Sequence, residues 1–209
     1  RGEVSGRTFP DAGQRELMNR GDRVVLGEDD RLTVVPPERP GVFSRVAGVR
    51  AIEGLEVLMA QAASEEGMAV SVFRVRPRHG QDVDWERVGS RVEAALDGRL
   101  ALQARVADHA RTYDRDVVAE AEPAPPEVRT DNEASGSATV IEVHAPDRTG
   151  LLYRITRALA DLDLDVRSAM VQTLGHRVVD SFYVRDLAGS KITDPEHLAE
   201  IEKALVHEL

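Results

Sequence analysis

The chain of 209 residues carries 37 acidic and 27 basic side chains, which give it a formal net charge of −10. This negative charge disfavours nucleic acid as a partner, because a phosphate backbone attracts basic surfaces. The absence of cysteine excludes disulfides and thiolate metal sites and fits a reducing cytoplasm. No apolar run has the length of a membrane span. We therefore expect a cytoplasmic protein of one or two small domains that does not act on nucleic acid or membranes.

Residues 1–30 are rich in glycine and charge and show no regular apolar spacing. This composition predicts a tether rather than a packed element. The chain does not begin with methionine, so we expect a fragment in which residues 1–30 lead from an absent catalytic part.

A first unit is expected over residues 31–98. Leu32–Val35 is β-branched and reads as a strand, and the helical spacing of the apolar residues after Gly41 predicts a helix that ends at Gly54. Two strands, 55–63 and 68–75, then form a hairpin. Asp84 is placed to cap a second helix. The predicted order is β-α-β-β-α.

A connecting segment is expected over residues 99–136. Arg99–Tyr113 reads as an additional helix, and Asp116-Val117-Val118 is a weak strand candidate that could close the first sheet. Three prolines within residues 123–126 forbid a helix and favour an extended spacer. We place the domain boundary there.

A second unit over residues 137–209 repeats the order. Its first strand contains Ile141 and Val143, and Thr149 is the expected cap of the following helix. A hairpin is predicted from strands 166–174 and 177–184. Asp194-Pro195 then provides an N-cap and a proline at the first position of the last helix.

The two units are copies of one pattern at an offset of 109 residues. Leu32–Val75 aligns with Ile141–Val184 without a gap, and it matches residues of the same type. The matched pairs are Arg39 with Arg148, Gly41 with Gly150, Arg45 with Arg154, Leu55 with Leu164, Val57 with Val166, Ala60 with Ala169, and Phe73 with Phe182. The order predicts an α+β fold of two ferredoxin-like βαββαβ-type units, with antiparallel sheets and helices on one face.

The strand-to-helix turn of each unit is the candidate site. Glycine allows a close backbone approach, and free amides at the start of a helix can donate hydrogen bonds to a carboxylate. The second turn, with the amides of Gly150 and Leu151 and with Asp165 opposite an ammonium group, is the stronger candidate. Pro40 removes a donor from the first turn. In the alternative interpretation, the glycines only permit close packing of helix on strand.

The turns Glu38-Arg39-Pro40-Gly41 and Asp147-Arg148-Thr149-Gly150 resemble those of ACT domains, a family of regulatory modules that bind small molecules. Segments 46–48, 129–135 and 145–155 are similar to the C-terminal tandem ACT region of PII uridylyltransferases, of an actinobacterial type. The resemblance implies an effector site where the turn of one unit faces a neighbouring unit. The residues expected to bind effector are Asp147, Arg148, Gly150, Leu151, Asp165, Glu38, Arg39, Gly41 and Glu56.

The resemblance also implies that the effector is an amino acid, glutamine, and that the parent enzyme adds and removes a nucleotidyl group on the protein PII, with Mg as its cofactor. We find no nucleotidyltransferase or hydrolase motif in this chain, so we expect no catalytic residue and no cofactor within it. A module that pairs or docks without ligand, including a homodimer, is the alternative.

Metal binding is not expected. The alternating carboxylates of Asp161–Asp165 resemble the start of a calcium loop, but Val166 and Gln172 stand where that loop needs glycine and glutamate. The six histidines are scattered without the spacing of a metal site.

The second unit ends within its last helix and so lacks a fourth strand of its own. We predict that Glu127–Thr130 pairs with a sheet edge and thereby holds the two units in a fixed orientation.

Overall fold

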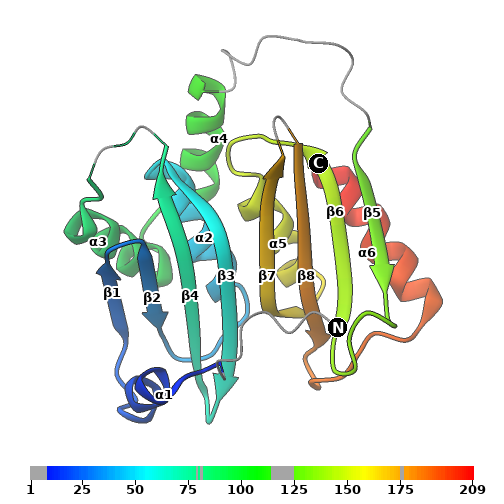
Figure 1. The fold of residues 1–209 in the computed structure, drawn as a ribbon, viewed down its shortest axis with the longest axis horizontal. Coiled ribbons are helices and arrows are strands. Elements are labelled where there is room, and N and C mark those ends of the chain that lie inside the picture. Colours follow the sequence, from blue (N-terminus) through cyan, green and yellow to red (C-terminus); the bar gives the residue numbers. More distant parts are fainter. Residues whose placement is uncertain (1–8, 79, 81, 114–124, 175–176) are drawn as a thin grey trace.

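The computed structural model describes residues 9–78, 80, 82–113, 125–174 and 177–209. The two predicted units are present, but their strands form one continuous antiparallel sheet of eight strands in the order β1-β2-β4-β3-β7-β8-β6-β5 (Figure 1). None of the helices in these ranges has the length and apolar character that a membrane crossing requires.

The first unit follows the predicted β-α-β-β-α order. Its elements are β2 (Arg31–Val35), α2 (Val42–Ile52), β3 (Leu55–Glu65), β4 (Met68–Pro77) and α3 (Trp85–Leu96). Asp84 caps α3 as predicted, because its side chain accepts a hydrogen bond from the amide of Arg87. The additional helix is also confirmed as α4 (Leu102–Tyr113). The weak strand candidate at 116–118 lies outside the described residues.

The second unit repeats this order. Its elements are β6 (Thr139–Pro146), α5 (Leu151–Asp161), β7 (Leu164–Leu174), β8 (Arg177–Asp186) and α6 (Pro195–Glu208). Asp194 caps α6 and Pro195 occupies its first turn, as the sequence predicts. The predicted cap of α5 is wrong. Gly150, with a φ of 80°, is the N-cap residue and supplies no side-chain bond, while Thr149 accepts a hydrogen bond from Arg78 instead.

Each unit is closed by a strand that precedes it. β1 (Val24–Glu28) pairs with β2, and β5 (Glu127–Asp131) pairs with β6, so each supplies the fourth strand of its sheet. The predicted pairing of Glu127–Thr130 is confirmed. However, β5 lies at the outer edge and does not join the units. Glu202 of α6 accepts bonds from the amide and hydroxyl of Thr130, which partly shields that edge.

The units are joined at the centre of the sheet. β3 pairs with β7 around Ala60 and Ala169, which occupy equivalent positions in the two copies. On the helical face, α2 and α5 pack against each other, and the core of both units is continuous. A Cβ at Gly48 of α2 would lie 2.8 Å from Tyr153 of α5, so the glycine is needed for this close approach. The joint therefore rests on strands and helices of the repeat itself.

Part of the predicted tether is structured. Residues 12–19 form α1 (Ala12–Asn19), which begins with a capping box between Asp11 and Gln14. The sequence pattern misses this helix because Met18 is its one buried residue and no apolar stripe results. The two β-branched residues Val24 and Val25 are too few to predict strand β1, which forms by pairing with β2.

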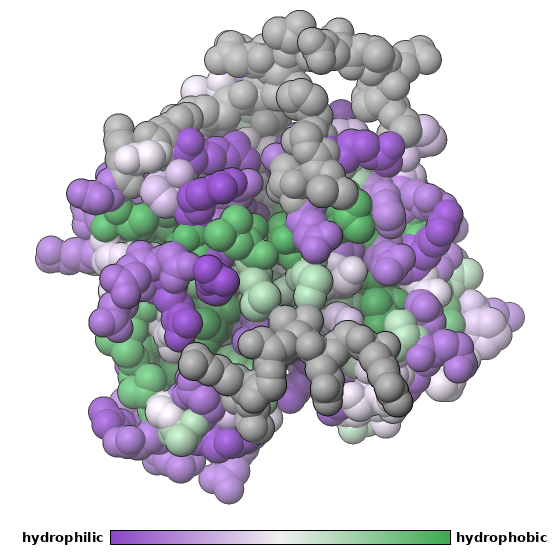
Figure 2. Space-filling model, in the orientation of Figure 1, coloured by the Kyte–Doolittle hydropathy of each residue, from purple (hydrophilic) through white to green (hydrophobic). Residues whose placement is uncertain are grey.

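Helix α1 lies on the face of the sheet opposite the other helices. Met18 packs there with Val35 and Val72 of the first unit. The equivalent positions of the second unit are His144 and Ser181, which are polar and need no cover. Figure 2 views this face and shows hydrophilic residues around its margin with hydrophobic residues between them. The two units thus share a core pattern but differ in their outer faces.

We predict that Met18→Ala lowers the free energy of unfolding by about 2 kcal/mol, because the side chain is 4% exposed and its removal leaves a cavity. Urea denaturation measures the change. Leu26→Ala is the matched control, since Leu26 is 50% exposed and its loss should cost under about 0.5 kcal/mol. Equal effects of the two substitutions would show that α1 does not dock on the sheet.

Candidate functional site

The first turn connects β2 to α2 and exposes amide groups. Gly41 is the N-cap of α2 and has a φ of 78°, a left-handed conformation that side chains disfavour. The first amides of an α-helix have no carbonyl partner within the helix. The amide of Val42 lies 3.4 Å from the carbonyl oxygen of Arg39, and the amides of Phe43 and Ser44 come next in this first turn of α2. The turn therefore offers donors to an anionic group.

A cavity of about 520 Å³ lies between this turn and the beginning of β7 in the other unit. Glu38, Arg39 and Gly41 line one side of it, and Asp165 lines the other. Four of the predicted effector residues are thus brought together across the joint between the units. A volume of this order accommodates a small organic ligand.

The remaining predicted residues gather at the opposite end of the sheet. Asp147, Arg148 and Leu151 of the second turn lie beside Glu56 of β3, around a space of only about 30 Å³. The turn of Gly150 adjoins it and has the same left-handed conformation as the first. Such a space holds a water molecule but no amino acid.

The two spaces are related by the internal repeat. Ten residues that line the small space have counterparts 109 positions away that line the large one, among them Glu38 with Asp147 and Glu56 with Asp165. The difference in volume follows from what fills them. Large side chains line the second space where small ones line the first, namely Val171 for Ala62, Val178 for Ala69 and Asp180 for Ser71.

Helix α4 also covers the second turn. Figure 1 shows α4 at the end of the sheet where β6 leads into α5. A Cβ at Gly150 would lie 2.4 Å from a methyl carbon of Val106, so the helix packs directly on this glycine. Arg78 donates to the hydroxyl of Thr149 over 3.1 Å. The second turn, which the sequence favoured as the binding site, is therefore occupied by the protein itself.

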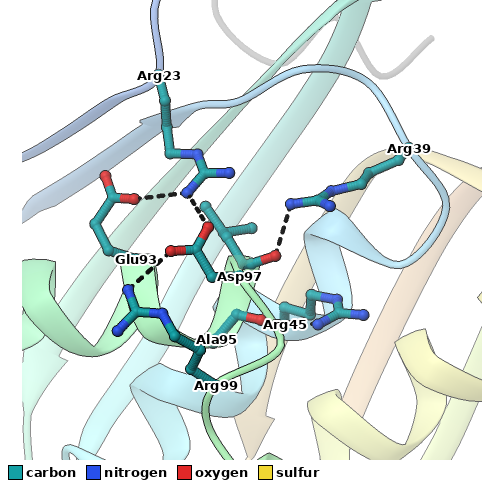
Figure 3. A network of polar contacts seen from close by, with 8 residues as sticks. Arg23, Arg39, Arg45, Glu93, Ala95, Asp97 and Arg99 are labelled. Atoms are coloured by element: carbon teal, nitrogen blue, oxygen red, sulfur yellow. Dashed lines mark hydrogen bonds and ion pairs between the residues drawn. The ribbon is translucent and has the colours of Figure 1, made fainter.

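Two arginines tie the first turn to the end of α3. Figure 3 shows Arg39 and Arg45 directed at that end. Arg39 donates to the carbonyl oxygen of Leu96 over 2.6 Å, and Arg45 to that of Ala95 over 2.8 Å. Free carbonyls at a helix C-terminus commonly accept such bonds. Arg39 therefore positions the turn, and its guanidinium is engaged in doing so.

The same network reaches the N-terminal segment. Arg23, just before β1, donates to Glu93 over 2.9 Å and to Asp97 over 2.6 Å, and Arg99 also bonds Asp97 (Figure 3). These hydrogen bonds, that from Arg23 foremost, lower the pKa of Asp97 to about 2. Polar contacts thus run from the first turn through the end of α3 to the strand that follows α1.

The acidic residue opposite each turn has an arginine partner. Asp165 lies 3.0 Å from Arg167, and Glu56 lies 2.7 Å from Arg76. Both pairs are partly exposed, so solvent screening keeps them weak. A cationic group in the large cavity can therefore compete with Arg167 for Asp165.

The apolar spacing of the sequence does not indicate that two charged residues are buried beside the small space. Arg50 is 8% exposed and Asp180 is 1% exposed. Among the residues that the structure describes, neither Nε of Arg50 nor Oδ1 of Asp180 has a hydrogen-bond partner. Burial, followed by the charge of Arg78, lowers the pKa of Arg50 to about 10. Burial raises the pKa of Asp180 to about 7, against a hydrogen bond from the backbone of Gln172 and the charge of Arg50. The offset of 109 residues was the one signal available, since it pairs Asp180 with Ser71.

Comparison with known proteins identifies the fold and its family. Residues 134–209 match the model of the ACR family N-terminal ACT domain. The chain is 40% identical over 185 residues to a bifunctional uridylyltransferase/uridylyl-removing enzyme of Gluconobacter oxydans. This match covers 85% of the chain and 19% of that protein. It is 38% identical over 195 residues to the enzyme of the same name from Rhodospirillum rubrum, with 87% of this chain and 20% of that protein covered.

The chain spans about a fifth of the length of these curated relatives. Among solved structures, aspartate kinase from Synechocystis is 18% identical with a TM-score of 0.37. The match covers 77% of this chain and 25% of the kinase chain, and the likeness is too weak to support an inference. The sequence matches and the β-α-β-β-α order of both units agree. The chain is therefore an ACT-domain region of the bifunctional uridylyltransferase/uridylyl-removing enzyme family, with two ferredoxin-like units in tandem.

Proposed function

We propose that this chain is the regulatory part of a PII nucleotidyltransferase, and that it senses glutamine at the cavity between the first turn and β7. The observation that carries the proposal is the placement of Glu38, Gly41 and Asp165 around one cavity of about 520 Å³ that both units line. A ligand held there touches both copies of the repeat. Its binding therefore favours one relative arrangement of the units, which is what an effector must do.

The chemistry of the cavity suits an α-amino acid. The amides at the start of α2 can donate hydrogen bonds to its carboxylate, and Asp165 can accept a hydrogen bond from its ammonium group. A ligand with millimolar affinity needs only about 4 kcal/mol of binding free energy, which a few charge-assisted hydrogen bonds supply. The acidic side chains around the cavity oppose a ligand with net negative charge.

The network of Arg39 suggests how binding is transmitted. The first turn is bonded to α3, and α3 is bonded to Arg23 ahead of β1. We infer that a shift of the turn on effector binding reaches the N-terminal segment by these bonds. In this proposal the catalytic part of the enzyme lies outside the chain and modifies PII, with Mg as its cofactor.

Calorimetric titration with glutamine tests the proposal, and we expect saturable binding to wild-type protein. Gly41→Val should weaken it by about tenfold to a hundredfold, because a β-branched residue at a φ of 78° costs about 1–3 kcal/mol and displaces the turn.

Gly54→Val is the matched control, since Gly54 has a φ of 66° and open space around its Cβ position away from the cavity. It should bind glutamine as wild type does. Absence of binding to wild-type protein would favour the alternative of a module that only pairs or docks.

A further inference from the structure

Ser71 is a buried polar residue of the first unit. It lies on β4 with its side chain on the helical face of the sheet, as its alternation with the core residue Phe73 requires. The residue is 2% exposed, and it lines the large cavity. Its neighbours on this face of the strand are Ala69 and Phe73, so an apolar side chain would be the ordinary occupant.

The hydroxyl of Ser71 differs from the other hydroxyls deep in this cavity. Ser44 donates to the carbonyl oxygen of Gly41 over 2.9 Å, and Thr156 donates to that of Leu152 over 2.7 Å. No hydrogen bond is found for the hydroxyl of Ser71 within the described ranges. Buried hydroxyls are normally hydrogen-bonded, because leaving one unpaired is costly. The partner of Ser71 is therefore expected to come from whatever fills the cavity.

The second unit provides a comparison, because the residue equivalent to Ser71 there faces a space too small for a ligand. The equivalent residue, Asp180, lines the small space, where Val171 and Val178 replace Ala62 and Ala69. At the large cavity, the same positions are small and leave room above Ser71. A polar residue thus occupies the floor of both spaces, and only at Ser71 does the floor carry a neutral donor and acceptor facing a ligand-sized volume.

We propose that Ser71 determines the specificity of the effector cavity by hydrogen bonding the polar end of the effector's side chain, so that a neutral carboxamide is preferred over an apolar side chain of similar length. This inference rests on the proposed function. The effector's carboxylate and ammonium group are held by the turn and by Asp165. Its side chain then extends toward the floor, where a buried hydroxyl discriminates against ligands that leave it unpaired.

The test compares glutamine with methionine, an apolar amino acid of similar length, by calorimetry on the full chain. Wild-type protein should prefer glutamine. Ser71→Ala should reduce this preference by about tenfold, because glutamine binding is weakened by the loss of one hydrogen bond. Because the hydroxyl has no hydrogen-bond partner among the described residues, Ser71→Ala should be at least as stable as wild type in urea denaturation.

A pair of variants of equal shape separates the hydroxyl from the volume. Ser71→Thr keeps a hydroxyl and should keep the preference for glutamine. Ser71→Val introduces a side chain of the same shape as threonine but without a hydroxyl, and it should lose the preference. If these two variants show equal preferences while wild-type protein still binds glutamine, the role of Ser71 is overturned and the proposed function stands. A wild-type chain that binds no glutamine would overturn both this inference and the proposed function.

Discussion

The double variant Ala62→Val, Ala69→Val should fold normally and bind glutamine at least about a hundredfold more weakly than wild type. These substitutions place in the large cavity the valines that the second unit carries as Val171 and Val178. Filling a cavity with methyl groups gains apolar contact, so the free energy of unfolding should change by less than about 1.5 kcal/mol. A ligand of drug-like or smaller size loses its affinity when its volume is taken.

Calorimetry measures the loss of binding, and denaturation in urea checks the fold. The mirror variant Val171→Ala, Val178→Ala is the control, because it enlarges the small space and leaves the large cavity unchanged. It should bind glutamine with wild-type affinity but lose stability through its new cavity. Wild-type affinity in the Ala62→Val, Ala69→Val variant would show that glutamine binds elsewhere.

Asp180→Asn should change how the stability of the chain depends on pH. Burial raises the pKa of Asp180 to about 7 in the folded chain, whereas an unfolded aspartate has a pKa of about 3.9. Between these values the folded chain holds a proton that the unfolded chain has released. The wild-type free energy of unfolding should therefore fall as pH rises from about 4 to about 7, by as much as about 4 kcal/mol from this group.

The asparagine variant stays neutral throughout and lacks this contribution. Urea denaturation at pH 4.5, 6 and 8 should show the difference between variant and wild type growing in favour of the variant, to about 2–4 kcal/mol at pH 8. Asp163→Asn removes an exposed carboxylate instead and should follow the wild-type curve. A difference that is the same at all three pH values would contradict a buried, protonated Asp180.

The repeat made most of the fold predictable. The offset of 109 residues placed both β-α-β-β-α units, and the caps at Asp84 and Asp194 marked two of the helices. Helix α1 was missed because its stability comes from Met18 docking on a distant strand, which local periodicity does not report. The joint between the units was missed because pairing of β3 with β7 depends on the whole sheet.

The candidate residues were predictable, but their relative importance was not. Gly41 and Gly150 look alike in sequence and have the same backbone conformation. They differ in what lies against them, which is the large cavity at Gly41 and Val106 of α4 at Gly150. The substitutions that set the two volumes, such as Val178 for Ala69, are visible in the repeat alignment. Their meaning depends on knowing that each turn faces the opposite unit.

We expect glutamine to bind at the first turn and across the joint to β7. Titration of the ¹⁵N-labelled chain with glutamine, followed by the chemical shifts of its backbone amides, tests this most directly. We predict saturable shifts at Gly41, Phe43 and Asp165 and none at Gly150 and Leu151. Shifts confined to Gly150 and Leu151, or no saturable shift at any amide, would contradict the claim.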